Sequence, residues 1–359
     1  KSSAASDVYK RQVWQSTADF PGVPEMMKVS AVAWSATAPG TLLAVFDGHK
    51  DDDFRPHVVR SDDYGVTWRD VTGDLPEFGP TRSVAIHPRN GELVFVGTEF
   101  GACFSNRGGD RWVALDHDLP TVAVHAIAVH PRENDLVLGT HGRGFQVLDD
   151  VGLLEALTPE MVASHSVLAT PRRATQIRSA NRGRGSVGDS YWTAENPPRG
   201  AMLDFWIGDS GVGEAWALDV LGADGSVLRH VASGTATRGA HRRIWDLRHE
   251  APLGADGQPS RRTRGRFVVP GTYAVRLAVG ETVHTRTLQV RMDPALDIAP
   301  ATRLALDETL ALQAALVGAA AVAGATVDTL RAHAGAVETL LEQTPSAPAA
   351  LGEAASALN

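Results

Sequence analysis

An internal repeat with a period of about 44 residues runs through the first half of this chain. The stretch SDDYGVTW, Ser61 to Trp68, is echoed by SNRGGDRW, Ser105 to Trp112, so both the serines and the tryptophans lie 44 positions apart. Repeats of this length are supersecondary units that cannot bury their apolar faces alone and must stack on their neighbours. Flanking stretches repeat in step: TGDLP at 72–76 with DHDLP at 116–120, SVAIHP at 83–88 with AIAVHP at 126–131, LVFVGTEFG at 93–101 with LVLGTHGRG at 136–144, and a weaker earlier copy at 29–48.

The apolar pattern inside each repeat predicts four short strands. Period and strand count together are those of a β-propeller blade, a four-stranded meander that packs against further blades around an axis. Three blades do not close a ring, because propellers have about 4–8. We therefore expect the chain to be the C-terminal portion of a longer propeller. The strands of the first repeat are expected at about 30–35, 41–46, 56–61 and 66–71.

The stretch SDDYGVTW is interpreted as a structural turn between the third and fourth strands. Gly65 supplies a positive φ, Ser61 and Asp63 hydrogen-bond the amides of the turn, and Trp68 begins the outer strand and packs between blades. The second copy has Arg107 where Asp63 stands, which a shared metal or acid role would not tolerate. The structural set comprises Ser61, Asp63, Gly65, Thr67 and Trp68 in the first copy, and Ser105, Gly109 and Trp112 in the second.

At these residues the chain resembles a known family. SDDYGVTW is similar to a full Asp-box and SNRGGDRW to a degenerate one, the repeat signature of sialidase-type (BNR) propellers. With GTEFGACFS and GTHGRGFQVLDD, residues 13–292 resemble bacterial sortilin-like or xyloglucanase-like BNR propeller proteins, which are often labelled glycosyl hydrolase. GTHGRGFQVLDD resembles the last blade, which the strand near 166–172 is expected to complete. The resemblance implies a periplasmic or secreted bacterial protein.

The remaining chain divides by pattern into further regions. Seven short strand-like runs between 201 and 291 predict a β-sandwich, and the pairing of RRIWDLR with VVPGTYAVRL resembles the FlgD-type Ig-like module, with Trp245 in its core. Leucines at helical spacing predict two amphipathic helices from about 301 to 343. The expected regions are a cloning-derived segment at 1–12, propeller blades at 13–178, an Ig-like sandwich at 179–295, and a truncated helical tail at 296–359.

Charge and cysteine content restrict the possible partners. The net charge of −8, with 42 acidic against 34 basic residues, argues against nucleic acid as a partner. A single cysteine, Cys103, excludes an internal disulfide and a cysteine-based zinc site. No apolar run approaches the roughly 18 residues that a transmembrane helix needs.

Candidate functional residues gather in the loops between second and third strands, opposite the Asp-box turns. Three interpretations of the loop DGHKDDDFR stay open: a Ca²⁺ site at Asp51–Asp53, glycosidase acid/base chemistry with Asp52 or Asp53 opposite Glu99, and a solvated acidic loop. A sialidase-type tyrosine nucleophile is not evident, because Tyr64 lies in a structural turn. The expected ligand-binding face comprises His49, Asp52, Asp53, Arg55, Glu99, His141 and Arg143.

Two functions from different classes follow. The leading hypothesis is a non-catalytic binding or scaffolding module with a carbohydrate, protein or peptide ligand at this face. The alternative is a glycoside hydrolase whose catalytic cleft is shared with further N-terminal blades. Exposed tryptophans along a groove would favour the hydrolase, whereas Trp34, Trp68 and Trp112 are all expected to be buried.

Overall fold

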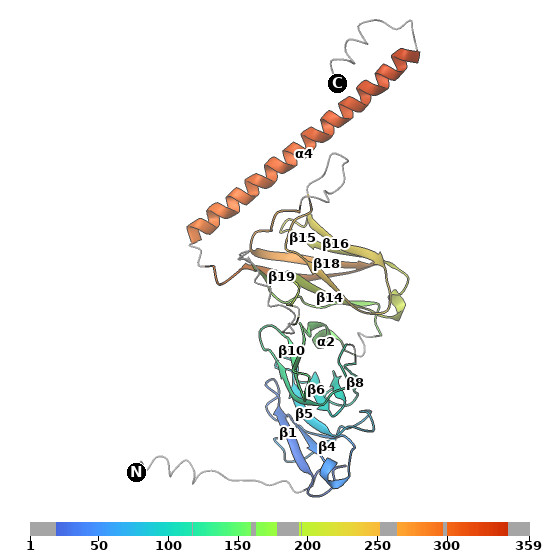
Figure 1. The fold of residues 1–359 in the computed structure, drawn as a ribbon, viewed down its shortest axis with the longest axis vertical. Coiled ribbons are helices and arrows are strands. Elements are labelled where there is room, and N and C mark those ends of the chain that lie inside the picture. The colour runs from blue at the N-terminus through green and yellow to red at the C-terminus, as the bar shows by residue number, and fades with distance from the viewer. Residues whose placement is uncertain are drawn as a thin grey trace, which may run out of the picture. The chain divides into compact units, whose positions relative to one another are not determined.

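The computed structural model describes residues 19–116, 118–158, 163–177, 194, 196–251, 264–296 and 300–343. The chain forms two compact units, one of residues 1–169 with 206–210 and one of residues 170–205 with 211–359. The first unit consists mainly of strands, and the second combines strands with one long helix (Figure 1).

The first unit is a series of antiparallel meanders. Two of them have four strands in sequential order, β1-β2-β3-β4 and β5-β6-β7-β8, and the third has the order β11-β10-β9. Each 44-residue repeat of the sequence therefore corresponds to one sheet. The strands are β1 (Lys28–Trp34), β2 (Leu42–Asp47), β3 (His57–Ser61), β4 (Arg69–Asp70), β5 (Thr81–Ile86), β6 (Val94–Thr98), β7 (Gly101–Ser105), β8 (Val113–Ala114), β9 (Val124–Val129), β10 (Leu136–Thr140) and β11 (Phe145–Leu148).

Successive sheets pack face to face, with β1 beside β5 and β5 beside β9. One apolar core lies between the first and second sheets and another between the second and third. The sheets approach closely near their first strands, where Ser83 Oγ donates to the carbonyl oxygen of Val124 at 2.8 Å. Gly97 lies at the same place, and a Cβ there would collide with Ser83 and Val124. First strands together and fourth strands outward is a propeller-like arrangement.

Two expectations about Trp packing are wrong. Trp34 is 73% exposed, because it lies on a face of β1 that no described residue covers. Trp68 is half-buried: its ring lies 5.3 Å from that of Phe20, and both rings pack on a core of the first sheet's own residues, Ala44, Phe46 and Val59. Trp112 alone of the three is buried between sheets.

Contrary to the expectation from the sequence, residues 166–172 do not form a fourth strand of the third sheet. β12 (Ser166–Leu168) belongs instead to a three-stranded sheet in the order β12-β14-β17. Its Val167 packs with Leu153 and Leu157, which belong to or follow the short helix α2 (Gly152–Ala156). β11 is therefore an edge strand in the described part of the chain.

The second unit contains a five-stranded sheet in the order β13-β19-β18-β15-β16. Trp245 is fully buried, and its indole Nε1 donates to the carbonyl oxygen of Arg248 at 2.8 Å. Of the seven strand-like runs expected between 201 and 291, the run at 266–269 forms only an isolated bridge between Phe267 and Arg248. The strands are β13 (Ala174–Gln176), β14 (Ala201–Ile207), β15 (Ala215–Leu221), β16 (Val227–Thr235), β17 (Gly239–Trp245), β18 (Gly271–Val279) and β19 (Thr282–Met292).

The segment expected to form two helices forms one, α4 (Pro300–Gln343). The Ala-rich middle, with Gly324 but no proline, has no residue that forces a break. None of the described helices, α4 included, combines the length and apolar character that a membrane crossing needs. Two further single turns are 3₁₀ helices, η1 (His49–Asp51) and η2 (Asp209–Gly211).

Candidate ligand-binding face

The loop face of the first unit is built from equivalent positions of its three sheets. Asp47 ends β2, whereas Glu99 and His141 directly follow β6 and β10. Arg82 and His125 occupy the irregular positions where β5 and β9 each shift register against the second strand of their sheet. The repeat therefore brings one polar side chain per sheet to this end, with a second polar side chain beside it in the second and third sheets.

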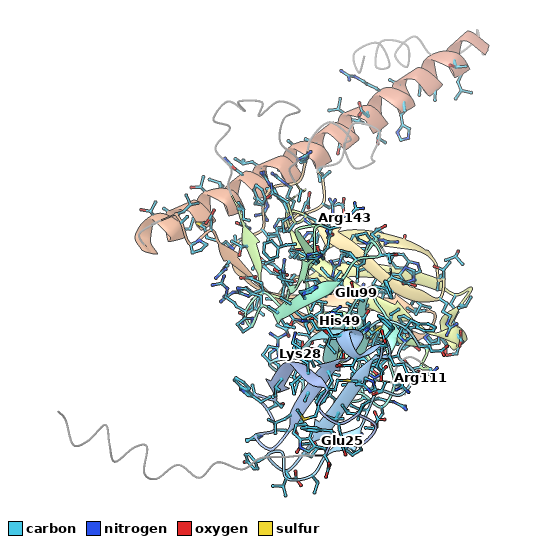
Figure 2. All side chains as sticks on the ribbon, turned by 60° about the horizontal axis from the view of Figure 1, so that its bottom comes forward. Glu25, Lys28, His49, Glu99, Arg111 and Arg143 are labelled. Atoms are coloured by element: carbon cyan, nitrogen blue, oxygen red, sulfur yellow. The ribbon has the colours of Figure 1, made fainter. Side chains whose placement is uncertain are left out.

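Asp47 is the centre of an ion-pair network that joins the first two sheets. Its carboxylate accepts a hydrogen bond from His49 Nδ1 at 2.7 Å and pairs with Arg82, which also contacts Glu99 (Nη2–Oε2 2.6 Å). Asp47 is only 3% exposed. Burial opposes its ionisation, but the hydrogen bonds from His49 and the charge of Arg82 outweigh burial, so its pKa lies below the ordinary value. Figure 2 marks His49 and Glu99, which Arg82 links.

The acidic loop that follows η1 is organised by its own basic residues. Asp53 accepts hydrogen bonds from the Arg55 guanidinium, with Nη2–Oδ2 at 2.7 Å, and from His57 Nε2 at 3.1 Å. The Arg55 hydrogen bonds hold the pKa of Asp53 well below its usual range. Asp52 adopts a left-handed conformation with φ 59°. Among the described residues, no group of three or more His, Cys, Asp or Glu side chains is arranged to hold a metal ion.

The third sheet places a histidine pair on the same end. The rings of His125 and His141 lie 5.5 Å apart between centroids and are both exposed. Arg143, labelled in Figure 2, is exposed in the same turn between β10 and β11. The structure thus assigns His49, Asp53, Arg55 and Glu99 to ion pairs and leaves His141 and Arg143 on the surface.

Exposed phenylalanines beside the ion pairs were missed by the sequence reasoning. Phe54, Phe78 and Phe100 are 49%, 64% and 57% exposed. Gly79, next to Phe78, donates its backbone N–H to the Phe54 carbonyl oxygen at 2.9 Å, and the Phe100 ring lies against Gly79. The three aromatic residues therefore come from three loops that touch one another. The sequence feature that could have revealed this surface is a bulky aromatic residue in each of three polar, glycine-containing loops.

The turn at residues 61–68 lies at the other end of the strands and is held by its own side chains. Ser61 Oγ accepts from the Gly65 amide at 2.8 Å, and Asp63 accepts from the Thr67 amide at 2.8 Å. The hydrogen bonds from Thr67 lower the pKa of Asp63 to about 2. Trp68 Nε1 donates to the Gly65 carbonyl at 3.0 Å. These donors and acceptors are used within the turn.

The second copy keeps the turn without the aspartate. Ser105 Oγ accepts from the amides of Arg107 at 3.2 Å and Gly109 at 3.0 Å. Gly109 has φ +102°, which a residue with a Cβ adopts only at a cost. The serine and the glycine are thus enough to make the turn.

The ion pairs determine what chemistry the loop face can perform. A glycosidase needs one carboxylic acid that stays protonated until it donates to the leaving oxygen. Asp47 and Asp53 have lowered pKa values, and Glu99 is paired with Arg82. These three carboxylates are therefore suited to fixed charge and hydrogen bonding.

Comparisons with known proteins give distant structural likeness only. No family model matches the sequence, and no curated protein matches it. A GH74 xyloglucanase from Xanthomonas campestris is 15% identical over 72% of this chain and 38% of its own, with a TM-score of 0.29. The extracellular domain of a hybrid two-component system from B. thetaiotaomicron is 13% identical over 75% of this chain and 31% of its own, with a TM-score of 0.27.

A third similar structure is YCF48 bound to D1 peptide, 13% identical over 73% of this chain and 67% of its own, with a TM-score of 0.27. The chain covers little more than a third of the length of the GH74 xyloglucanase and of an ancestral GH74 enzyme, at 38% and 36%. Similarities of this size do not bear on what the chain does.

Proposed function

We propose that this chain is a non-catalytic binding or scaffolding module of a secreted or envelope-associated bacterial protein. In this proposal the first unit is part of an Asp-box β-propeller of the sortilin-like type, and its loop face binds the ligand. The second unit is an Ig-like sandwich that acts as a spacer. Two sheets, with Trp245 buried in the unit, support that assignment.

The observation that carries the proposal is the pairing of every buried or half-buried carboxylate of the loop face with an arginine. Asp47 and Glu99 share Arg82, and Asp53 binds Arg55. A carboxylate held by a guanidinium is a poor proton donor, because the cation stabilises the ionised form. The same pairing fixes the loops in place, which favours binding by lowering the entropy lost when a ligand docks.

The exposed phenylalanines favour a protein or peptide ligand. Phe54, Phe78 and Phe100 form an apolar surface next to arginine and carboxylate groups. Aromatic side chains surrounded by polar groups are typical of the centre of protein interfaces. Phenyl rings also stack on sugars, so carbohydrate binding by the same protein is measured alongside peptide binding.

The test selects peptides from a random-peptide phage library on the full chain and measures their affinity for variants. Phe54→Ala and Phe100→Ala are expected to weaken the selected peptides at least about tenfold, as for interface residues that contribute most to binding. Tyr64→Ala is the matched control, because Tyr64 is 73% exposed and lies in the Asp-box turn at the opposite end. A thermal melt of each variant checks that the fold is retained.

The same protein is assayed for release of reducing sugar from xyloglucan and from sialylated oligosaccharides. We expect no turnover. Hydrolysis that Asp53→Asn or Glu99→Gln abolishes would instead establish the glycoside hydrolase alternative. Oligosaccharide binding without hydrolysis, lost in Phe100→Ala, would change the ligand class and keep the binding function. Peptides that bind all variants equally would contradict the loop face as the binding surface.

A further inference from the structure

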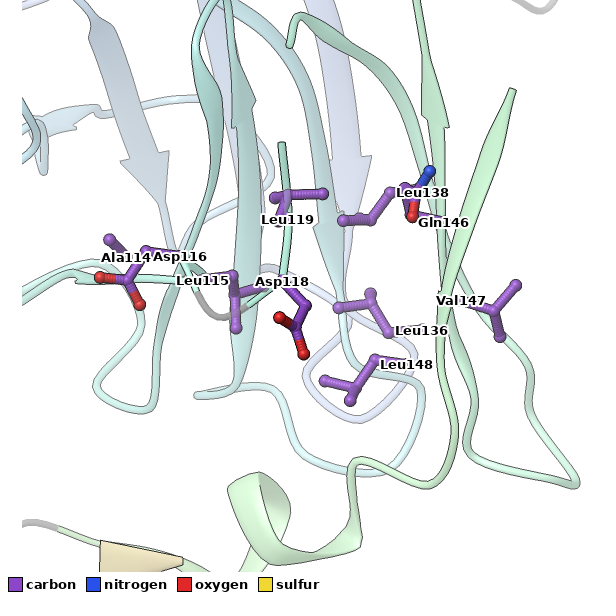
Figure 3. Close-up of a pocket in the computed structure, with 10 residues that line it drawn as sticks. All are labelled: Ala114, Leu115, Asp116, Asp118, Leu119, Leu136, Leu138, Gln146, Val147 and Leu148. Atoms are coloured by element: carbon purple, nitrogen blue, oxygen red, sulfur yellow. The ribbon is translucent and has the colours of Figure 1, made fainter. Parts of the chain in front are cut away.

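A hollow of about 380 Å³ lies between the second and third sheets of the first unit. Figure 3 shows the leucines of β10 and β11 facing those that follow β8 across it. It opens beside β11, the edge strand of the third sheet. Its lining comprises Ala114, Leu115, Asp116, Asp118, Leu119, Leu136, Leu138, Gln146, Val147 and Leu148.

The corresponding place between the first and second sheets is filled by Trp112. Its side chain is 5% exposed and packs in a core with Val71, Leu75, Val94 and Val96. The indole Nε1 donates to the Val71 carbonyl oxygen at 2.9 Å.

Asp74 forms the polar edge of the site that Trp112 fills. Its carboxylate accepts a hydrogen bond from the backbone N–H of Trp112 at 2.7 Å. The preceding Arg111 approaches the same carboxylate, with Nε–Oδ2 at 3.8 Å. An Arg-Trp pair is therefore held through one aspartate.

Strand register shows that the hollow has the same walls. In the second sheet Val94 pairs with Ser105 and Val96 with Cys103, whereas in the third sheet Leu136 pairs with Leu148 and Leu138 with Gln146. The loop leading out of the fourth strand repeats at 44 positions. The neighbours of Trp112 and their counterparts at the hollow are Val71 and Leu115, Asp74 and Asp118, Leu75 and Leu119, Val94 and Leu136, Val96 and Leu138, and Cys103 and Gln146.

Among the described residues, neither a counterpart of Trp112 nor a counterpart of the strand that carries it is present at the hollow. In the first two sheets the fourth strand pairs with the third, and the residue three positions after the Trp donates its N–H to the third strand: Val71 to Val58 O at 2.9 Å and Leu115 to Ala102 O at 2.8 Å. In the described part of the chain β11 has no such partner. Edge strands of this kind accept added strands.

We propose that this hollow is the binding site for a tryptophan side chain carried by an extended peptide, which adds to β11 as an antiparallel fourth strand. Its indole N–H donates to the carbonyl oxygen of Leu115, the counterpart of Val71. A basic residue before the Trp lies against Asp118, the counterpart of Asp74, and the two charged residues among the described lining, Asp116 and Asp118, are both acidic. The ligand is therefore a strand of the form Arg-Trp-x-x-(Val/Leu), as at 111–115.

The test uses a fluorescein-labelled peptide with the sequence of residues 105–116, SNRGGDRWVALD, and the full chain. We expect saturable binding by fluorescence anisotropy. Replacing the peptide Trp by Ala is expected to weaken binding at least about tenfold, because most of the buried contact is lost. Replacing the Arg before it by Ala weakens binding about two- to fivefold, as for an exposed ion pair. These peptide changes do not affect the folding of the protein.

Two protein variants locate the site. Gln146→Trp fills the hollow and is expected to reduce affinity at least about tenfold, whereas Asp118→Asn removes the charge and reduces it about two- to fivefold. Tyr64→Ala at the distant turn leaves affinity unchanged. A 5-fluorotryptophan in the peptide gives a ¹⁹F signal that shifts and loses its solvent isotope effect when the indole is buried.

Three results would each overturn the proposal. They are equal binding of the Trp-to-Ala peptide, binding that Gln146→Trp leaves intact, and absence of binding at about 1 mM peptide, a concentration at which even contacts worth about 4 kcal/mol register.

Discussion

Replacing Trp112 by alanine is the most direct perturbation of the packing between successive sheets. The side chain is 5% exposed and joins residues of both sheets in one core, so its removal leaves a cavity that the strands on either side cannot close. Truncation of a buried Trp costs about 3–5 kcal/mol. About 1 kcal/mol of this comes from the hydrogen bond to the Val71 carbonyl oxygen, which would lose its partner.

The matched controls occupy similar positions but differ in burial. Trp68 lies at the same place in the first repeat and is half-buried, so we expect Trp68→Ala to cost clearly less than Trp112→Ala. Trp34 is 73% exposed, and Trp34→Ala should change stability by no more than about 0.5 kcal/mol. The order of destabilisation is therefore Trp112, then Trp68, then Trp34.

The assay is native-state hydrogen exchange, followed by mass spectrometry on peptides that cover β6 and β7. A whole-chain melt is unsuitable, because a chain of two compact units need not unfold in one step. A loss of 3 kcal/mol speeds exchange through unfolding about a hundredfold, since each 1.4 kcal/mol is tenfold. A cost below about 1 kcal/mol for Trp112→Ala, or equal costs for Trp112 and Trp68, would refute the inter-sheet role of Trp112.

Three further predictions concern single side chains. Asp63→Asn should destabilise the chain at neutral pH but not near pH 2. The carboxylate has a pKa of about 2 when folded and 3.8 when unfolded, so its contribution to stability is lost as pH falls between these values. Acid titration followed by circular dichroism measures this loss. The thiol of Cys103, whose pKa burial raises to about 11, should react with iodoacetamide only in denaturant, and rapid native labelling would contradict its burial. Burial lowers the pKa of His249 to about 4, so between pH 6.5 and 4 the unfolded chain binds a proton at this residue that the folded chain does not, and stability falls as the pH falls. His249→Gln should make this fall in stability smaller, and an unchanged dependence of stability on pH would show that His249 is accessible.

The repeat alone was enough to predict the two four-stranded sheets of the first unit and three strands of the third, because a period of two within strands and glycine-containing turns between them is a local property. The first strand of the second predicted β-region likewise begins where the sequence places it, at Ala201. What covers each face depends on distant residues. Trp68 and Trp112 hold the same motif position, yet one packs against Phe20 and the other between two sheets.

The candidate site was predicted in part. The loop positions of Asp53 and Glu99 could be inferred from strand order, but their arginine partners could not. Arg82 reaches Asp47 from the next sheet, 35 positions along the chain, and only the pairing of sheets brings them together. The same holds for the phenylalanine surface, whose three members come from separate loops.

The spacing of Gly97 and Trp112 has a consequence for curvature. Near the first strands, Gly97 and Ser83 let the second sheet approach the backbone of Val124, whereas at the fourth strand an indole separates the first sheet from the second. A small residue at the inner edge of the second interface and a large one at the outer edge of the first each widen the angle between the two sheets that they separate. A larger residue at position 97 would reduce that angle. Residue size at these few positions therefore determines the angle between successive sheets.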